Sequence, residues 1–373
     1  MKRLLLAGGG HSHVEVVRRF GLQPPGKTEI VLASPARYTV YSGMLPGLIA
    51  GHYDFYDCHI DLEALCRSAA VTFRQTEVAG LDFARNCALL GTGSELPFDF
   101  LSLDVGSTPD AAGAAGGSSH SFPVKPVSVL LAGLETILAA ARLAPQDVVI
   151  VGGGAGGVEL ALAVHHRLRE RHAREARVSL VTDTPAILPA HPAAARRRFE
   201  QVCAERGIRL QCGSRASRTE PGALCLENGT RLAADWILWA TSATAPAWLA
   251  ASGLTIDARG FVLVNDTLQS VSHPNVFAAG DCASLNSRPL PKSGVYAVRQ
   301  GPPLAANLRS VLAGGPLRRY QPQRYALSLI SAGDRRAVAS WGPVVLEGGW
   351  AWRWKDRIDR RFMARYRSTA YRP

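Results

Sequence analysis

Two glycine-rich turns constrain this sequence more than any other feature. The first, Gly8-Gly9-Gly10-His11-Ser12-His13, follows the apolar run Leu4-Leu5-Leu6-Ala7. The second, Gly152-Gly153-Gly154-Ala155-Gly156-Gly157, follows Val148-Val149-Ile150-Val151, and a helical pattern comes after each turn. A buried strand, a glycine turn and a helix are the first three parts of a βαβ unit. The chain therefore contains two such units, which form an internal repeat on the scale of a domain.

The glycines of these turns predict dinucleotide binding. One glycine permits the tight turn, and a second lets backbone amides approach a pyrophosphate at the positive end of the helix. The glycines at these places are Gly8, Gly10, Gly152 and Gly154. Gly157 completes the G-x-G-x-x-G pattern of the second turn, whereas His13 stands at that position of the first. We expect His13 either to loosen the packing of helix on strand or to place an imidazole near the phosphates.

The residue that ends the second strand of each unit bears on the choice of nucleotide. In the first unit this strand ends at Ser34-Pro35, where Ser34 can make a single hydrogen bond. In the second unit it ends at Thr182-Asp183. The Asp183 carboxylate would accept from the ribose hydroxyls of NAD and would repel a 2′-phosphate. The sequence therefore favours NADH and leaves NADPH open.

Composition excludes several other classes. No run of about 18 uncharged apolar residues occurs, and glycine interrupts the short N-terminal apolar run, so we expect neither a spanning helix nor a signal peptide, and a cytoplasmic protein. The seven cysteines lack Cys-x-x-Cys and zinc-site spacing, which predicts buried thiols and no metal site. Residues 350–373 hold eight Arg or Lys against two Asp, half of the net charge of +12. So local an excess does not indicate a nucleic-acid-binding face.

Further segments match a known family. The chain resembles the pyridine nucleotide-disulfide oxidoreductases, within them the type II NADH dehydrogenases, and more closely still the NADH-dehydrogenase-like domain that occurs fused to selenide, water dikinase. The resemblance spans nearly the whole chain and implies an α/β fold of two Rossmann-like dinucleotide-binding domains. It places an FAD domain at 1–115 and 259–325, an inserted NAD(P) domain at 116–258, and a C-terminal segment with short strands and a basic amphipathic helix at 326–373.

The matching segments imply the residues that bind each cofactor. Residues 34–47 resemble a loop beside the flavin, residues 104–109 a crossover, residues 275–283 a Gly-Asp motif, and residues 292–300 a helix start aimed at the flavin. The predicted FAD-binding residues are Gly8, Gly10, His11, Ser12, His13, Ser34, Pro35, Arg37, Ser42, Gly43, Val78, Asp104, Gly106, Ser107, Gly280, Asp281, Ser293, Gly294 and Val295. The predicted residues for NAD(P)H are Gly152, Gly154, Gly157, Asp183, Ala240 and Thr241.

The resemblance implies hydride transfer from NADH or NADPH to FAD, with Glu159 and Lys125 near the reacting rings. Neither helix after a glycine turn carries a cysteine pair and no cysteine follows Cys282, so we do not expect disulfide reduction. A quinone is the leading electron acceptor, although the two glutamines of the family's quinone motif correspond here to Val295 and Arg299. The alternatives are a flavin-binding redox sensor or partner subunit, and a reductase serving selenium or sulfur metabolism.

The basic tail has the composition of an interfacial membrane helix, because it combines tryptophan with Arg and Lys. At helical spacing, Ala351, Trp354, Ile358, Phe362 and Tyr366 fall on one stripe. The tail predicts contact with a membrane surface, which would make the protein peripheral on the cytoplasmic face. The alternative is packing on its own domain or on the mate of a homodimer.

Overall fold

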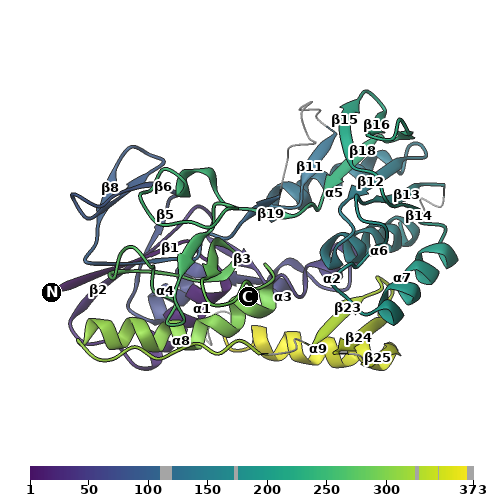
Figure 1. Ribbon diagram of the computed structural model, residues 1–373. Helices are drawn as coiled ribbons and strands as arrows, with labels where there is room; N and C mark the ends of the chain where they lie inside the picture. Colours follow the sequence, from purple (N-terminus) through teal and green to yellow (C-terminus); the bar gives the residue numbers. More distant parts are fainter. Residues whose placement is uncertain (110–119, 172–174, 324–326, 343, 368–373) are drawn as a thin grey trace.

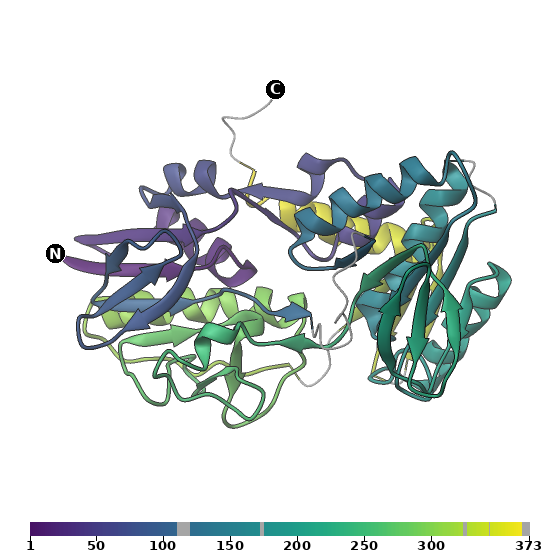
Figure 2. The ribbon, with the colours of Figure 1, turned by 90° about the horizontal axis from the view of Figure 1, so that it is seen from above.

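The apolar runs before the glycine turns form the central strands of two parallel sheets. A computed structural model describes residues 1–109, 120–171, 175–323, 327–342 and 344–367. The sheets lie in two lobes side by side, and the C-terminal segment runs along both (Figures 1 and 2). Strands of this kind are buried on both faces, which explains their continuous apolar sequences. The predicted α/β class is confirmed.

The first lobe, which we call the flavin lobe, is built on a sheet of order β21-β9-β1-β2-β5. Helices α1 and α8 pack together along it (Figure 1). Because β21 joins this sheet from late in the chain, the lobe consists of two separate stretches of sequence. The bounds are β1 Lys2–Ala7, α1 His11–Leu22, β2 Thr28–Ser34, β5 Thr72–Gln75, β9 Phe100–Leu103, β21 Val276–Ala278 and α8 Gly294–Leu312.

Smaller elements surround this sheet. A β-meander follows β5, a ribbon and short helices follow β2, and a two-stranded parallel pair flanks η2. The bounds are β3 Tyr38–Val40, α2 Leu45–Ala50, α3 Phe55–Cys58, β4 His59–Asp61, α4 Leu62–Ser68, β6 Val78–Asp82, β7 Cys87–Leu90, β8 Glu95–Pro97, β20 Val262–Val264, η2 Gly280–Cys282 and β22 Ala283–Leu285. A turn in which Asp257 Oδ1 accepts from two backbone amides precedes β20.

The second lobe, the nucleotide lobe, has a sheet of order β11-β18-β12-β13-β14. Helix α6 follows the second glycine turn, and an antiparallel sheet β15-β16-β17 lies beside the parallel one. The bounds are β11 Ser121–Pro123, α5 Val127–Ala140, β12 Asp147–Val151, α6 Ala155–Glu170, β13 Arg177–Val181, α7 Ala193–Glu205, β14 Arg209–Gln211, β15 Ala216–Glu220, β16 Ala223–Leu226, β17 Arg231–Ala233, β18 Trp236–Trp239 and η1 Ala247–Leu249.

The chain passes between the lobes along a short antiparallel ribbon. Strand β10 (Thr108–Pro109) pairs with β19 (Ala243–Thr244), so that the end of the crossover expected at residues 104–109 lies beside the chain that follows Thr241. Thr108 and Thr244 also join their hydroxyl groups at 3.0 Å. The predicted domain boundary at 115/116 lies outside the described residues.

The C-terminal segment forms a sheet of β23 (Ser328–Ser331), β24 (Ala337–Trp341) and β25 (Val344–Gly348), followed by α9 (Gly349–Met363). Small side chains of β24 and α9 pack against each other at Ala337, Ala339 and Ala351. No helix among the described stretches is long and apolar enough to cross a membrane.

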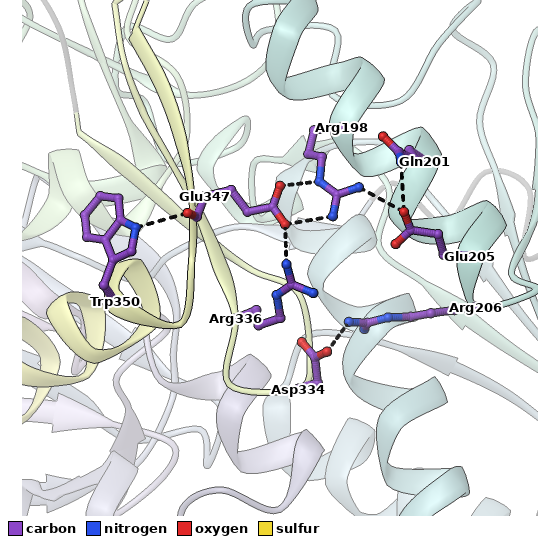
Figure 3. A network of polar contacts seen from close by, with 8 residues as sticks. All are labelled: Arg198, Gln201, Glu205, Arg206, Asp334, Arg336, Glu347 and Trp350. Carbon is purple, nitrogen blue, oxygen red and sulfur yellow. Dashed lines mark hydrogen bonds and ion pairs between the residues drawn. The ribbon is translucent and has the colours of Figure 1, made fainter.

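Ion pairs fasten this segment to the nucleotide lobe (Figure 3). Glu347 of β25 accepts from Arg198 of α7 at 2.7 Å and from Arg336 at 2.9 Å. About two helical turns further along the chain, just past the end of α7, Arg206 pairs with Asp334 at 2.6 Å. Charged contacts from β25 and from the turn between β23 and β24 therefore hold the C-terminal sheet on α7 and on the residue that follows it.

Candidate functional site

The first glycine turn is packed against Asp104, which comes directly after β9. A Cβ atom at Gly10 would lie 2.3 Å from the carboxyl carbon of Asp104. Oδ2 of Asp104 accepts from the backbone amides of Ser12 at 2.8 Å and His13 at 3.0 Å. Gly10 therefore makes room for a protein carboxyl group, in addition to the ligand approach predicted for it.

His13 is fully buried at the position of the third glycine. One ring nitrogen contacts the carbonyl oxygen of Gly8 at 2.7 Å, and the other contacts Ser102 Oγ of β9 at 2.8 Å. Burial lowers the pKa of His13 to about 4, so the ring is neutral at physiological pH. The His13 ring therefore does not lie where we expected it, near the phosphates. It fills the space between α1 and the sheet, and the packing of the helix on the sheet stays intact.

Three predicted residues from both lobes meet beside η2. Lys125 Nζ, which follows β11 in the nucleotide lobe, donates to Asp281 Oδ2 at 2.9 Å and to Ser107 Oγ at 3.0 Å. Ser107 Oγ also donates to Asp281 Oδ2 at 3.1 Å. Burial would raise the pKa of Asp281, but Lys125 and Ser107 outweigh it and leave that pKa lowered. The cluster therefore holds a charged carboxylate where a lysine of the nucleotide lobe contacts the flavin lobe.

The start of α8 meets the loop that follows β3. A Cβ atom at Gly294 would lie 2.4 Å from Ser42 Oγ, so the start of α8 lies directly against the Ser42 side chain. The amide of Ser42 donates to His11 Nε2 at 3.4 Å. Within α8, Gln300 Oε1 accepts from the amide of Gly280 at 2.7 Å, and so orients the Gly-Asp motif. Ser293 caps the helix start, and Val295 is exposed beyond it.

The remaining predicted flavin residues lie along the edge of the lobe. Ser34 is buried beside Gly9, and Val78 is buried at the start of β6. Gly106 adopts a left-handed conformation with φ of +74°. Arg37 is not brought to Asp281: its guanidinium pairs with Asp61 at 2.6 Å and with Glu63 at 3.1 Å. Pro35 and Gly43 flank the segment that carries Arg37, Pro35 before it and Gly43 after it.

The second glycine turn has the geometry of an open nucleotide cradle. A Cβ atom at Gly152 would lie 2.2 Å from the carbonyl oxygen of Ala240, and one at Gly157 would lie 1.8 Å from that of Gly152. A Cβ atom at Gly154 would meet nothing within 4 Å. Asp183 is exposed just beyond β13. The turn is thus tight against its own chain and open on the side that a pyrophosphate would occupy; Thr241 follows Ala240 along this edge.

A polar cluster under α9, in which Lys355 and Asp359 are buried and the other members half-buried, was not predicted from sequence beyond Glu159. We call Glu159, Lys355, Asp359 and Tyr41 the tail cluster. Lys355 Nζ donates to Asp359 Oδ2 at 2.6 Å and to the carbonyl oxygen of Gly43. Glu159 Oε1 accepts from the amide of Ser331 at 2.7 Å. Burial raises the pKa of Glu159 to about 7, against the attraction of Lys355.

The same cluster raises two further pKa values. Burial raises the pKa of Asp359, with Lys355 and Tyr41 opposing it, and burial together with Asp359 raises the pKa of Tyr41. The i, i+4 spacing of Lys355 and Asp359, on the helix face that also carries Ala351 and Phe362, was the one sequence signal for this pair.

Comparison with known proteins decides the family. The sequence pattern of the family described as pyridine nucleotide-disulphide oxidoreductase matches residues 8–301. The chain belongs to this family. Its members are flavoprotein oxidoreductases that use FAD and NAD(P)H. The predicted membership is confirmed; the likeness to the domain fused to selenide, water dikinase is not shown by these matches.

Two relatives show how much of this chain is matched by other proteins. Ferroptosis suppressor protein 1 of Xenopus tropicalis is 27% identical over 279 residues, which cover 71% of this chain and 70% of the relative. Demethylphylloquinone reductase NdbB of Synechocystis sp. is 27% identical over 365 residues, which cover 93% and 88%. The family likeness therefore extends into the C-terminal segment.

Solved structures share the fold of this family member. Sulfide:quinone oxidoreductase from Aquifex aeolicus superposes with a TM-score of 0.83 at 21% identity, covering 98% of this chain and 92% of the other. NDH2 from Plasmodium falciparum in complex with NADH gives 0.81 at 14% identity, covering 96% and 97%.

The residues present fit both cofactors of the family. The second glycine turn leaves no side chain in the way of a pyrophosphate at Gly154, where nothing lies within 4 Å of a built Cβ atom, whereas the first turn has the Asp104 carboxyl group beside Gly10. The charged Asp281 carboxylate suits the hydroxyl groups of a ribityl chain. The N-terminus of α8 carries the partial positive charge that favours electron density on a flavin ring. The first glycine turn and Asp281 would hold FAD, and the second glycine turn would hold NAD(P)H, while Lys125 joins the nucleotide lobe to Asp281.

Proposed function

We propose that this chain is an FAD-dependent NAD(P)H oxidoreductase that reduces a quinone. The overall reaction takes NAD(P)H, one quinone and one proton to NAD(P)⁺ and quinol. Quinone reduction therefore needs a proton from solvent beside the flavin. The tail cluster carries the proposal, because it combines a carboxyl with a pKa of about 7, Glu159 on Ser331, with a lysine that contacts the Gly43 loop. The names of relatives, a demethylphylloquinone reductase and a sulfide:quinone oxidoreductase, support the same acceptor.

The protein's own groups have separate tasks in this proposal. FAD, when bound, would accept hydride from the nicotinamide and pass electrons to the acceptor. Asp281, Ser107 and the first glycine turn hold and orient it, while Lys125 fixes Asp281 in its charged form. Glu159 holds a proton below about pH 7, and Lys355 positions it by charge. Asp183, exposed at the end of β13, favours NADH over NADPH.

We propose that the domains are those predicted, with FAD bound by 1–115 and 259–325 and the nucleotide by 116–258. The return of β21 to the first sheet and the placement of β11 and β18 in the second support this division. The segment 326–373 would then close the gap between the two, because α9 reaches Gly43 and β23 reaches Glu159.

Quinone turnover should depend on Glu159 in a pH-specific way. With NADH in excess, the wild-type rate is expected to fall as pH rises through about 7, because the protonated carboxyl is the form that can donate. In Glu159→Gln the rate should drop by about tenfold to a hundredfold and lose that dependence. Anaerobic bleaching of the flavin by NADH should survive, and the measurement compares this bleaching with steady-state turnover on a water-soluble quinone.

The control for this experiment is Glu135→Gln, an exposed carboxyl on α5 that should behave as wild type. An unchanged pH profile in Glu159→Gln would contradict the role of Glu159. A flavin that NADH bleaches but no quinone reoxidises would favour the redox-sensor alternative.

Acceptors that need a reactive thiol fit this chain poorly. All seven cysteines are free, and six of them are buried. Burial raises the pKa of Cys282 to about 12, and its thiol donates to the carbonyl oxygen of Ala279 at 3.2 Å. A thiol in this state is a packing group and not a nucleophile. We therefore place the selenium or sulfur reductase second to quinone reduction.

We further propose that the C-terminal segment docks on a membrane surface. The stripe predicted for α9 is split: Ala351, Phe362 and Tyr366 face the protein, whereas Trp354 and Ile358 face outward. The outer tail face is the set of exposed apolar side chains on α9, β24 and β25, namely Trp341, Val344, Leu346, Trp350, Trp354 and Ile358. Exposed Arg353, Arg357 and Arg361 border it on α9, which suits anionic lipid headgroups.

The triple variant Trp350→Ser, Trp354→Ser, Ile358→Ser should bind vesicles containing anionic lipid at least about tenfold more weakly than wild type. Sedimentation of the protein with vesicles measures this, and Val271→Ser, which removes an apolar side chain that is 42% exposed outside this face, is the control. Equal binding by the triple variant would refute membrane docking. A wild-type dimer that the variant converts to monomers would assign the face to a second copy of this chain.

A further inference from the structure

Asp104 brings a carboxyl group to the N-terminal end of α1, the end that the first glycine turn precedes. The residue is 3% exposed. Its Oδ2 takes the amides of Ser12 and His13, and Oδ1 faces two glycines: a Cβ atom at Gly10 or at Gly280 would lie 2.4 Å or 2.2 Å from it. The carboxyl group thus shares the positive end of α1 with any phosphate that approaches the first glycine turn.

No cation neutralises this carboxyl among the described contacts. The titratable groups that face it are His11 and His13 from α1, Asp281 and Cys282 from η2, and Lys125 from the nucleotide lobe. Lys125 is engaged by Asp281, and the rings of both histidines are neutral because burial lowers each pKa to about 4. Burial raises the pKa of Asp104 to about 7, against the two amide hydrogen bonds.

We propose that Asp104 takes up a proton from solvent when FAD binds. The inference rests on FAD occupying the first glycine turn and is independent of the electron acceptor. The pyrophosphate of FAD adds two negative charges at a helix end that already holds a buried carboxyl, and a like charge disfavours the ionised form. The new O–H bond forms at Oδ1, since Oδ2 retains the two amides. Asp104 is therefore a positioning residue. Its negative charge disfavours the binding of FAD, whereas the shape of its side chain does not.

Proton uptake has a measurable consequence for FAD affinity. If Asp104 is ionised before FAD binds and protonated afterwards, the binding of each FAD is accompanied by the uptake of about one proton from solvent. The dissociation constant of FAD then rises by about tenfold for each pH unit above the pKa of the free protein. FAD should be held most tightly in mildly acidic solution.

The test dilutes the full-length holoprotein between about pH 7 and pH 9 at constant ionic strength and follows released FAD by its fluorescence. Wild type should show the tenfold change per pH unit, and Asp104→Asn, which keeps the shape without the charge, should change by less than about threefold. Asp99→Asn removes a carboxylate before the same strand β9, one that is paired with Arg3 at 2.8 Å, and should retain the wild-type profile.

Equal pH profiles in wild type and Asp104→Asn, or a flat wild-type profile, would overturn the proposal. If Asp104→Asn does not fold, calorimetry of wild-type FAD binding in two buffers of different ionisation enthalpy decides: about one proton per FAD supports uptake, and none refutes it. No NAD(P)H or quinone is present, so these results stand apart from the fate of the quinone proposal. A chain that never holds FAD would instead defeat the proposed function itself.

Discussion

Gly157→Ala should cost the protein about 3 kcal/mol of unfolding free energy and abolish reduction of the flavin by NADH. The added methyl group would lie 1.8 Å from the carbonyl oxygen of Gly152. The backbone at Gly152 cannot move away at low energetic cost. Its φ is +131°, and a Cβ atom built on it would lie only 2.2 Å from the carbonyl oxygen of Ala240, so it is already packed against that chain. Helix α6 would have to separate from the turn, and the nucleotide cradle would open.

Two neighbouring glycines provide matched controls for this prediction. A Cβ atom at Gly156 or at Gly154 meets nothing within 4 Å. Gly156→Ala lies inside α6 and should be neutral or stabilise by up to ~1 kcal/mol, since alanine favours the helix. Gly154→Ala should fold and keep its flavin but bind NADH weakly, because the methyl group would point into the cradle. Thermal unfolding and NADH titration measure all three, and a Gly157→Ala protein as stable as Gly156→Ala would show that the turn is not tightly packed.

Lys355→Met should destabilise the protein by about 3–5 kcal/mol, because it leaves the Asp359 carboxylate buried without its partner. The two groups are 2.6 Å apart with side chains 11% and 5% exposed, so water can replace little of the lost interaction. Quinone turnover should fall by at least about tenfold, since the Gly43 loop and Glu159 both lose the lysine.

The double variant Lys355→Met, Asp359→Leu separates stability from function. Replacing both members of a buried ion pair by apolar groups is often neutral, so unfolding by urea should be restored to within ~1 kcal/mol of wild type. Turnover should stay low, because the lysine is still missing. A double variant that recovers turnover would show that Lys355 only balances Asp359, and a stable Lys355→Met would show that the pair is hydrated.

The parts of this site that are local in sequence could be predicted, and those that depend on tertiary contacts could not. The two strand–turn–helix units follow from adjacent residues, and so their place in the fold was clear. Lys355 looked like one more cation of a basic tail, because its spacing to Asp359 indicates a helical ion pair but nothing near it in sequence shows that the Gly43 loop covers this pair. Arg37 was assigned to the flavin by its position in a motif, which stays a prediction, and its ion pair with Asp61 could not be read from that motif.

The orientation of α9 was ambiguous for a physical reason. Helical spacing identifies which side chains share one stripe of a helix, and a stripe of hydrophobic side chains is then expected to be the buried face. Here the buried face contains a compensated ion pair, and the exposed face contains two tryptophans, Trp350 and Trp354, whose rings stack 6.3 Å apart. His13 was ambiguous in the same way, because only its contact with Ser102 shows that the ring fills the core.

The C-terminal segment also touches the first helix of the chain. Tyr366 donates to Glu15 at 2.9 Å across 351 residues, and Lys355 reaches the Gly43 loop from nearly as far. During synthesis the first strands of the flavin lobe are made early, whereas Tyr366 and Lys355, which contact this lobe, are made near the end. The lobe therefore lacks these contacts for almost the whole period of translation. A polypeptide shortened before Tyr366 would present an incomplete lobe to chaperones and proteases, and FAD would be acquired after that residue has emerged from the ribosome.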